Sequence, residues 1–496
     1  MSSAIGSVDL IVLVVAVGCS IALGLYLSGK NTSVEAYLLG DRSLPWWAIL
    51  GSIVATETST ATVLSVPGEG YGPTGMRFLQ MAMGYICGRW IVVQWLLPLY
   101  FRGTLSSAYE VLGIRFGEKT KRTASLIFLV ARNLGDGLRL YLAASVLQIL
   151  VGWPLPLSAL VVGVVTIVYT YFGGMRSVVW NDCIQFVIYM LGGVASIFVI
   201  VANIPGGWSA LWEFCEANNK LQVLDFDWDA KYSFWGGVFG GAFLTIGTHG
   251  TDQMMVQRYL SARSQRDAGR ALLASGFVVL AQFALFLFIG VELAAYYSQA
   301  NLADMPEKAD QVFAHFIIHV FPKNTGLVGL MLAAIMAAAM STLSSSLNSS
   351  ASAVINDFII PIRQRAQREL RPDALLALTR YLAVGFGLLQ ILIGMSAQNF
   401  GDTVVSNALK IAGFSAGLIL GLFALGVLTR RVGQLASLVG CAGGFVLLML
   451  AQFVAPRFDW VISVPWLALT GAVSTFCIGY LASWIVPAEP QTQETR

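Results

Sequence analysis

The stretch STLSSSLNSS (341–350) concentrates seven hydroxyl side chains and one asparagine in ten positions. Ser341, Ser344 and Ser345 stand at i, i+3 and i+4, so they share one face if the segment is helical. Neutral oxygens in this arrangement suit a hard cation such as Na⁺ better than Zn²⁺ or Cu⁺, which prefer nitrogen or sulfur. The alternative is close packing of small residues, which accounts for the alanines of the preceding MLAAIMAAAM but not for the hydroxyls. The remaining serines of the cluster are predicted to serve packing.

A second polar stretch, ATETSTAT (55–62), interrupts an apolar run with five hydroxyls and Glu57. It predicts a broken helix, whose free backbone carbonyls would join hydroxyls as Na⁺ ligands; alternatively, the hydroxyls bond to their own helical turn. A comparable interruption, rich in glycine and threonine, lies at 245–252 around His249. The two interrupted spans begin five spans apart, which is the pattern of two five-helix halves that each start with a broken helix.

Charged residues inside apolar segments are costly and usually face a bundle interior. Asp182 could cap a helix N-terminus or supply one negative charge to a cation site. Arg132, Asp136 and Arg139 fall close to one helix face. They could form a self-contained ion-pair ladder, or an arginine could face a cavity and receive a substrate carboxylate.

The composition places these residues in a membrane. Of 496 residues, 56% are hydrophobic and 11% charged, and the mean hydropathy is +0.72, whereas a soluble chain carries roughly a quarter charged residues. Charge-free runs of about 20 residues predict spanning helices in a lipid bilayer, hence an all-α integral membrane protein. The six cysteines have no disulfide or metal spacing, and the sequence has no catalytic set and no basic nucleic-acid arm. We expect neither an enzyme, nor nucleic-acid binding, nor an obligatory protein partner.

The apolar segments predict about thirteen spans, at 8–27, 45–66, 77–100, 122–151, 155–172, 181–203, 233–257, 271–297, 325–357, 376–396, 404–427, 433–454 and 462–485. Basic residues gather in alternate loops, such as the one with Arg258 and Arg263, and such loops stay in the cytoplasm. We therefore predict a multi-pass protein of the cell membrane, with the N-terminus outside and the tail 486–496 inside. No Lys or Arg precedes the first run, which predicts a span rather than a cleaved signal peptide.

Several segments together resemble the sodium/solute symporter family. They are ATETSTATVLSVPGEGY (55–71), SAYEVLGIRF (107–116), YFGGMRSVVWNDCIQ (171–185), TDQMMVQRYL (251–260) and STLSSSLNS (341–349). The resemblance implies the leucine-transporter fold, a five-plus-five inverted-repeat core with one helix before it and two after. It places the extra N-terminal helix at 1–30, the repeats at 45–203 and 233–427, and the C-terminal helices at 433–485.

The resemblance also implies sodium ligands. A common site would take backbone carbonyls and hydroxyls from Ala55, Thr58, Ala338, Ser341 and Thr342. A second site, present in some members, would use Asp182, Ser341, Ser344 and Ser345. Two coupled ions per cycle are therefore our hypothesis.

A substrate pocket is expected between the second, third, fourth, seventh and eleventh spans. Its candidate contacts are Glu57, Thr62, Gln80, Arg139, Thr245 and His249. Glu57 departs from the small or hydroxyl residue that relatives carry there, and would meet a cationic or hydroxylated substrate or titrate as a proton site.

The predicted function is a sodium-coupled symporter that imports a small polar solute by alternating access, with one or two Na⁺ per cycle. The arginines of the fourth span favour an organic anion, a carboxylate or sialic-acid-like solute. Sodium-coupled sugar or amino-acid symport is the alternative. The alternative from another class is an ion channel or membrane sensor on the same fold.

Overall fold

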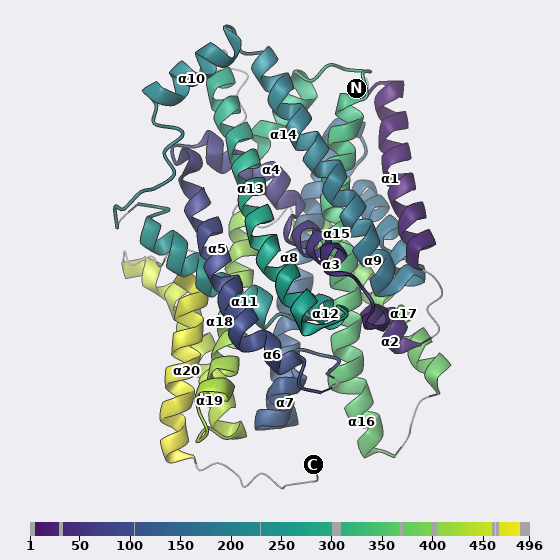
Figure 1. The fold of residues 1–496 in the computed structure, drawn as a ribbon, viewed down its shortest axis with the longest axis vertical. Coiled ribbons are helices and arrows are strands. Elements are labelled where there is room, and N and C mark those ends of the chain that lie inside the picture. Colours follow the sequence, from purple (N-terminus) through teal and green to yellow (C-terminus); the bar gives the residue numbers. More distant parts are fainter. Residues whose placement is uncertain are drawn as a thin grey trace.

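The computed structural model describes residues 5–28, 33–103, 105–228, 230–299, 309–367, 371–397, 404–458, 462 and 466–486, and the regular elements within them are helices (Figure 1). The α-helices are α1 Ser7–Ser28, α2 Val34–Leu39, α3 Trp46–Glu57, α4 Thr60–Tyr71, α5 Leu79–Ile91, α6 Leu97–Tyr100, α7 Glu110–Phe116, α8 Glu118–Val151, α9 Leu155–Ala202, α10 Gly207–Ala217, α11 Gly241–Gly250, α12 Gln253–Leu260, α13 Gln265–Ser298, α14 Val312–His319, α15 Leu327–Val354, α16 Ile360–Arg365, α17 Pro372–Ser396, α18 Val404–Leu428, α19 Gln434–Met449 and α20 Leu467–Ile485. Turns of π-helix continue or precede four of them, at Val92–Leu96, Gly236–Gly240, Ile355–Ile359 and Leu450–Val454.

Eight helices of the described chain are long and apolar enough to cross a membrane, or nine spans if the bent pair α3 and α4 is counted as one. Three predicted spans fall short for physical reasons. The helix at 122–151, α8, carries Arg132, Asp136 and Arg139, while the segments 77–100 and 233–257 are divided by π-turns or a break. The count of thirteen therefore stays a prediction.

α9 differs from the prediction of two spans joined by a loop. It runs as helix from Leu155 to Ala202 except at Gly174, where φ is 58° and ψ is −163°. A side chain there would also collide with Tyr37, whose carbonyl oxygen lies 2.8 Å from an ideal Cβ position. Only glycine combines a positive φ with the absence of a side chain, so the chain can change direction at this one residue. The inner loop that was predicted between the two spans is therefore helical.

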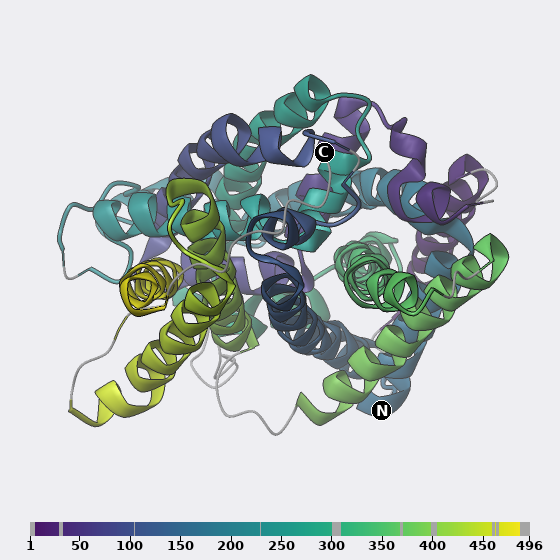
Figure 2. The same ribbon diagram turned by 90° about the horizontal axis from the view of Figure 1, so that it is seen from below.

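α15 forms the centre of the molecule. Every residue from 331 to 353 is buried, because alanine and serine let α9, α1, α8 and α17 approach closely. Large apolar side chains such as Leu10, Phe198 and Leu392 are exposed on the outer helices, as expected where lipid replaces water. Figure 2 looks from below, with α15 near the middle and the group α18, α19 and α20 at one side.

Asp9 joins α1 to the beginning of α15. Its carboxylate is fully buried and accepts hydrogen bonds from the backbone amides of Asn324 at 2.7 Å and Gly326 at 2.8 Å. Longer bonds come from Gly6 and Gly329 at 3.3 and 3.4 Å. A carboxylate in this place satisfies amides that have no partner within helix α15 and complements its dipole, so a residue of the first helix caps a later one.

We expect Asp9→Ala to lower the free energy of unfolding by about 1 kcal/mol, the usual effect of losing a helix cap. Thermal unfolding of the purified protein in detergent measures it. Ser7→Ala is the matched control, because the Ser7 hydroxyl makes only an exposed 3.4 Å contact with Asn324. Equal melting temperatures for both variants would contradict the assigned role of Asp9.

Candidate cation and substrate site

The predicted break in the second span is confirmed. α3 ends at Glu57, α4 begins at Thr60, and the two axes are bent by 62°. The Thr58 amide still bonds to the Val54 carbonyl at 3.0 Å, while the Thr58 hydroxyl bonds to the same carbonyl and accepts from Gln282 at 2.5 Å. The C-terminal carbonyls of α3 therefore lie at the break, in the interior of the bundle.

A second break separates α11, which ends at Gly250, from α12, which begins at Gln253. Thr251 leaves the helical conformation, and the Asp252 side chain accepts from the Met254 amide at 2.8 Å. This is a standard N-cap, which explains why a new helix starts there. The interruption predicted at 245–252 is thus confirmed.

α15 meets the broken helix through Thr342. Its hydroxyl lies 3.2 Å from the Thr56 carbonyl and 3.3 Å from the Ala338 carbonyl. Two residues predicted for the common sodium site, Ala338 and Thr342, are therefore in contact. Two others, Ala55 and Thr58, are buried and flank the segment around Thr56 in the sequence. Ser341 points elsewhere, because its hydroxyl donates to Asp182. Carbonyl and hydroxyl oxygens of this kind are the donors Na⁺ takes.

Asp182 is the centre of a buried oxygen cluster. Its carboxylate accepts from Ser341 and Ser52 at 2.6 Å each and from Thr56 at 3.3 Å. Ser345 lies 3.2 Å from the Thr56 hydroxyl. Asp182 sits well inside α9, so the helix-capping alternative is wrong.

Ser344 stands slightly apart from the other residues predicted for the second sodium site. Its hydroxyl donates to the Ser341 carbonyl at 3.1 Å, within its own helix.

Arg258 was expected in a cytoplasmic loop, and that expectation is wrong. The residue lies in α12, only 1% exposed, and its guanidinium pairs with Asp182 at 3.3 Å. The same nitrogen, Nη2, donates to the hydroxyls of Thr56 and Ser345. The cluster therefore already contains one fixed positive charge.

A cavity of about 210 Å³ opens beside the break in α3 and α4. Its walls come from the five predicted spans, together with α12 and α13, and include Phe78, Tyr85 and Phe283. The predicted contacts that line it are Glu57, Thr62, Arg139, Thr245 and His249. Mostly apolar walls with a few polar groups are typical of a small-molecule site.

Gln80 lies outside this lining. Its amide group donates to the carbonyls of Arg77 and Tyr232 at 3.1 and 2.9 Å and accepts from the Asp225 amide at 3.0 Å. The side chain fastens the segment before Gly236 to α5, so its hydrogen bonds serve the fold.

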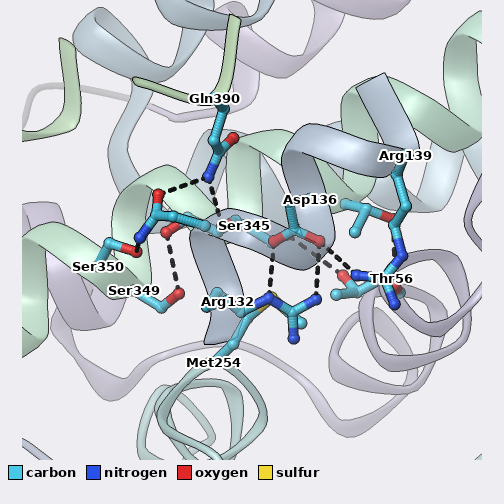
Figure 3. Close-up of polar contacts among 12 residues, drawn as sticks. Thr56, Arg132, Asp136, Arg139, Met254, Ser345, Ser349, Ser350 and Gln390 are labelled. Atoms are coloured by element: carbon cyan, nitrogen blue, oxygen red, sulfur yellow. Dashed lines mark hydrogen bonds and ion pairs between the residues drawn. The ribbon is translucent and has the colours of Figure 1, made fainter. Parts of the chain in front are cut away.

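The predicted ion-pair ladder of Arg132, Asp136 and Arg139 is present (Figure 3), while binding of a substrate carboxylate by one of the arginines stays a prediction. Asp136 is fully buried and accepts from both arginines, with two bonds from Arg132 at 2.7 and 3.0 Å. The ion-pair ladder therefore exists. Arg132 and Arg139 nevertheless line the cavity, and the buried Arg139 Nε lacks a partner among the described residues.

Glu57 faces Arg89 and His249 across the cavity wall. Arg89, fully buried in α5, pairs with the Glu57 carboxylate and lies 3.2 Å from His249 Nε2. The other ring nitrogen of His249 lies 3.1 Å from the Thr248 hydroxyl. His249 Nε2 also lies 3.4 Å from the Glu57 carboxylate, so the three residues form one cluster in which Arg89 balances the charge of Glu57.

The serines assigned to packing do more than fill space. Gln390 of α17 donates to Ser346 and to Asn133 at 2.9 Å each, and Asn133 of α8 donates to Ser350 at 3.3 Å (Figure 3). Ser349 bonds within its own helix. The far face of α15 is thus hydrogen-bonded to α8, which carries the cavity arginines.

Arg89, Arg258, Asn133 and Gln390 are among the site residues that the sequence did not predict, as are Ser52 and Thr56 beside Asp182. Arg89 lies alone in the apolar run GYICGRWIVV, and an isolated charge in a span is itself a signal of function. Arg258 has a weaker signal, because basic residues at the cytoplasmic ends of spans are ordinary. Asn133 and Gln390 gain their roles only from packing of α8, α15 and α17.

A model of the sodium:solute symporter family matches residues 37–444. The chain belongs to this family. It is 30% identical over 455 residues to the sodium-dependent multivitamin transporter of Oryctolagus cuniculus, covering 90% of this chain and 70% of that protein. It is 27% identical over 434 residues to the sodium-coupled monocarboxylate transporter 2 of Mus musculus, covering 86% and 69%.

The fold is also that of a solved transporter. The structure of a Na⁺-coupled sialic acid symporter superimposes with a TM-score of 0.85 at 24% identity, covering 98% of this chain and 99% of that one. The family is one of sodium-coupled membrane transporters and not of enzymes. Na⁺ is thus cargo of this family member, and the buried oxygens around Thr342 and Asp182 are of the type that binds it.

The Glu57–Arg89 pair predicts a strongly coupled double-mutant cycle. Arg89→Gln takes the cation from the Glu57 carboxylate, which is 17% exposed at the cavity, and we expect the free energy of unfolding to fall by about 1–3 kcal/mol. Glu57→Gln in the same chain should restore part of that loss, because it removes the unpaired charge. Thermal unfolding in detergent measures all four proteins; additive effects would show that the pair is not coupled.

Proposed function

We propose that this protein is a sodium-coupled symporter that imports a small organic anion, carrying a carboxylate, by alternating access. The observation that carries the proposal is the position of Arg132 and Arg139 on the cavity wall, beside the broken helix. Asp136 pairs with both arginines, and Asp252 lies 3.8 Å from Arg132. A guanidinium can bind a substrate carboxylate through two parallel hydrogen bonds.

The charge balance of the cavity supports an anion. The charges that line it or pair with the lining are three arginines and three carboxylates: Arg89, Arg132, Arg139, Glu57, Asp136 and Asp252. Bound Na⁺ would leave this region positive, and an anionic solute would neutralise it. Two of the similar proteins are described as transporters of carboxylates, namely monocarboxylates and sialic acid.

Na⁺ is proposed to bind between α3 and α15, at the carbonyls of Ala55, Thr58 and Ala338 and the hydroxyls of Ser341 and Thr342. An ion bridging these two helices would stabilise the arrangement in which the cavity is open to the outside, and linkage would raise substrate affinity in that state. A second Na⁺ is proposed at Asp182, Ser341, Ser344 and Ser345. Each charge moved through 100 mV contributes roughly 2.3 kcal/mol to accumulation.

The proposed topology has thirteen spans in the cell membrane, with inverted repeats at 45–203 and 233–427, the N-terminus outside and the C-terminus in the cytoplasm. The 48 residues of α9 measure roughly 70 Å as helix, about twice a bilayer core of 30 Å, which supports two spans there. The arginine-bearing helices α7 and α16 lie at one end of the molecule and α10 and α14 at the other (Figure 1), which supports the orientation.

Uptake into proteoliposomes tests the proposal. A thermal-shift screen of carboxylates in Na⁺ and in K⁺ first selects a solute, because a bound substrate stabilises by mass action. We expect that solute to accumulate only with an inward Na⁺ gradient. Solute-independent current at high rate would instead indicate a channel.

Arg139→Gln should weaken the apparent affinity for the anionic solute by about ten- to hundredfold, the usual effect of losing a hydrogen bond to a charged group. Uptake kinetics at saturating Na⁺ measure it. Arg122→Gln is the control on the same helix, because Arg122 contacts Glu118 at 3.8 Å and does not line the cavity. An unchanged KM in Arg139→Gln would exclude the carboxylate-binding role.

The Na⁺ dependence of uptake tests the ion count. With two ions, the Hill coefficient of wild type should exceed one and fall to near one in Ser345→Ala, which removes a ligand of the second site. Ser349→Ala is the control, since that hydroxyl bonds within α15. A wild-type coefficient near one that persists in Ser345→Ala would argue for one ion.

A further inference from the structure

Arg258 occupies the oxygen cluster around Asp182 as a bound cation would. Its Nη2 atom lies among the Asp182 carboxylate, the Thr56 hydroxyl and the Ser345 hydroxyl. The rest of the guanidinium is held by Ser52, which accepts from Nε at 2.9 Å, and by the Met254 carbonyl, which accepts from Nη1 at 2.7 Å. Asp182 and Arg258 are 0% and 1% exposed.

The guanidinium and Na⁺ are alternatives at this place. Each carries one positive charge, and each can be held by one carboxylate and nearby hydroxyl oxygens. Asp182 and Ser345, which belong to the proposed second sodium site, are both in contact with Arg258. A Na⁺ coordinated by these two residues would need the space that Nη2 fills.

Arg258 is also linked to the substrate cavity. It lies in α12, whose first residues follow the break at Thr251 and whose Met254 and Met255 line the cavity. The Arg258 guanidinium itself bonds to the Met254 carbonyl. A rearrangement of α12 at the cavity would therefore move the charge that faces Asp182.

We infer that Arg258 is a tethered cation that alternates with Na⁺ at Asp182, an inference that rests on the proposed second sodium site. When Na⁺ binds, the guanidinium leaves the Asp182 carboxylate. When Na⁺ is released, the guanidinium returns, so that the ion-free carrier can reorient without a bare charge in its interior. A buried carboxylate with no counter-ion costs several kcal/mol, which would otherwise slow that step.

Equilibrium binding of radioactive sodium to the purified full-length protein tests the inference without a substrate. Arg258→Gln removes the competitor, so sodium affinity at the Asp182 site should rise by about tenfold or more if the guanidinium holds the site nine-tenths of the time. Arg258→Lys keeps the charge but cannot span Ser52, Thr56, Ser345 and Met254 together. It should raise affinity by a smaller factor.

Further outcomes make the result decisive. In an Asp182→Asn background, Arg258→Gln should give no gain in affinity, because the contested carboxylate is gone. Unchanged or weaker sodium binding in both Arg258→Gln and Arg258→Lys would overturn the inference. If Arg258→Gln does not fold, the sodium affinity of Arg258→Lys alone tests the inference. An affinity equal to that of wild type in Arg258→Lys would then overturn it, because the charge is kept and only the contacts of the guanidinium are lost. Wild-type protein that binds no sodium at all would instead refute the proposed function.

Discussion

A charged carboxylate in the interior of a membrane protein is costly unless a cation or several hydrogen-bond donors compensate it, and Asp182 imposes this constraint on the centre of the molecule. Four elements meet around it: α9 supplies the carboxylate, α3 supplies Ser52 and Thr56, α15 supplies Ser341, and α12 supplies Arg258. None of these groups could be left alone in a low-dielectric interior without a cost of several kcal/mol. The packing of the four helices therefore depends on which cation neutralises Asp182. Such a dependence is what coupling of ion binding to a conformational change requires.

Breaks in two helices make such a centre possible. An unbroken helix uses its carbonyls internally and offers a cation only side chains. Where α3 stops before α4, and α11 before α12, the chain presents backbone groups and short polar side chains. The cavity adjoins both breaks, because Glu57 and His249 at the two helix ends line it. The proposed ion and solute sites would therefore share helices.

Much of this arrangement could be predicted from the sequence. Helical spacing grouped Ser341 and Ser345 on one face, the family resemblance associated that face with Asp182, and local polarity located both breaks. Composition likewise indicated a helical membrane protein. These features are encoded locally, by the period of the helix and by stretches too polar for lipid.

The remainder depends on which surfaces pack together. Arg258 looked like an ordinary basic residue beyond the end of a span, and only the fold of α12 brings it under α3. Gln80 has the right position in the chain for the cavity, yet its amide turns to the carbonyl of Tyr232. Ser346 gains its partner from α17, a helix remote in sequence. Such contacts have no short-range signature, so one sequence cannot specify them.

The bond between Asp9 and Gly326 has a consequence for how the chain is made. The two residues are 317 positions apart, and translation at 5–20 residues per second needs about 15–60 s to cover that interval. Throughout this time α1 lacks the backbone amides of Asn324 and Gly326, which donate to Asp9 in the folded protein. The contact that holds α1 against α15 can therefore form only after the chain has been synthesised as far as Gly326.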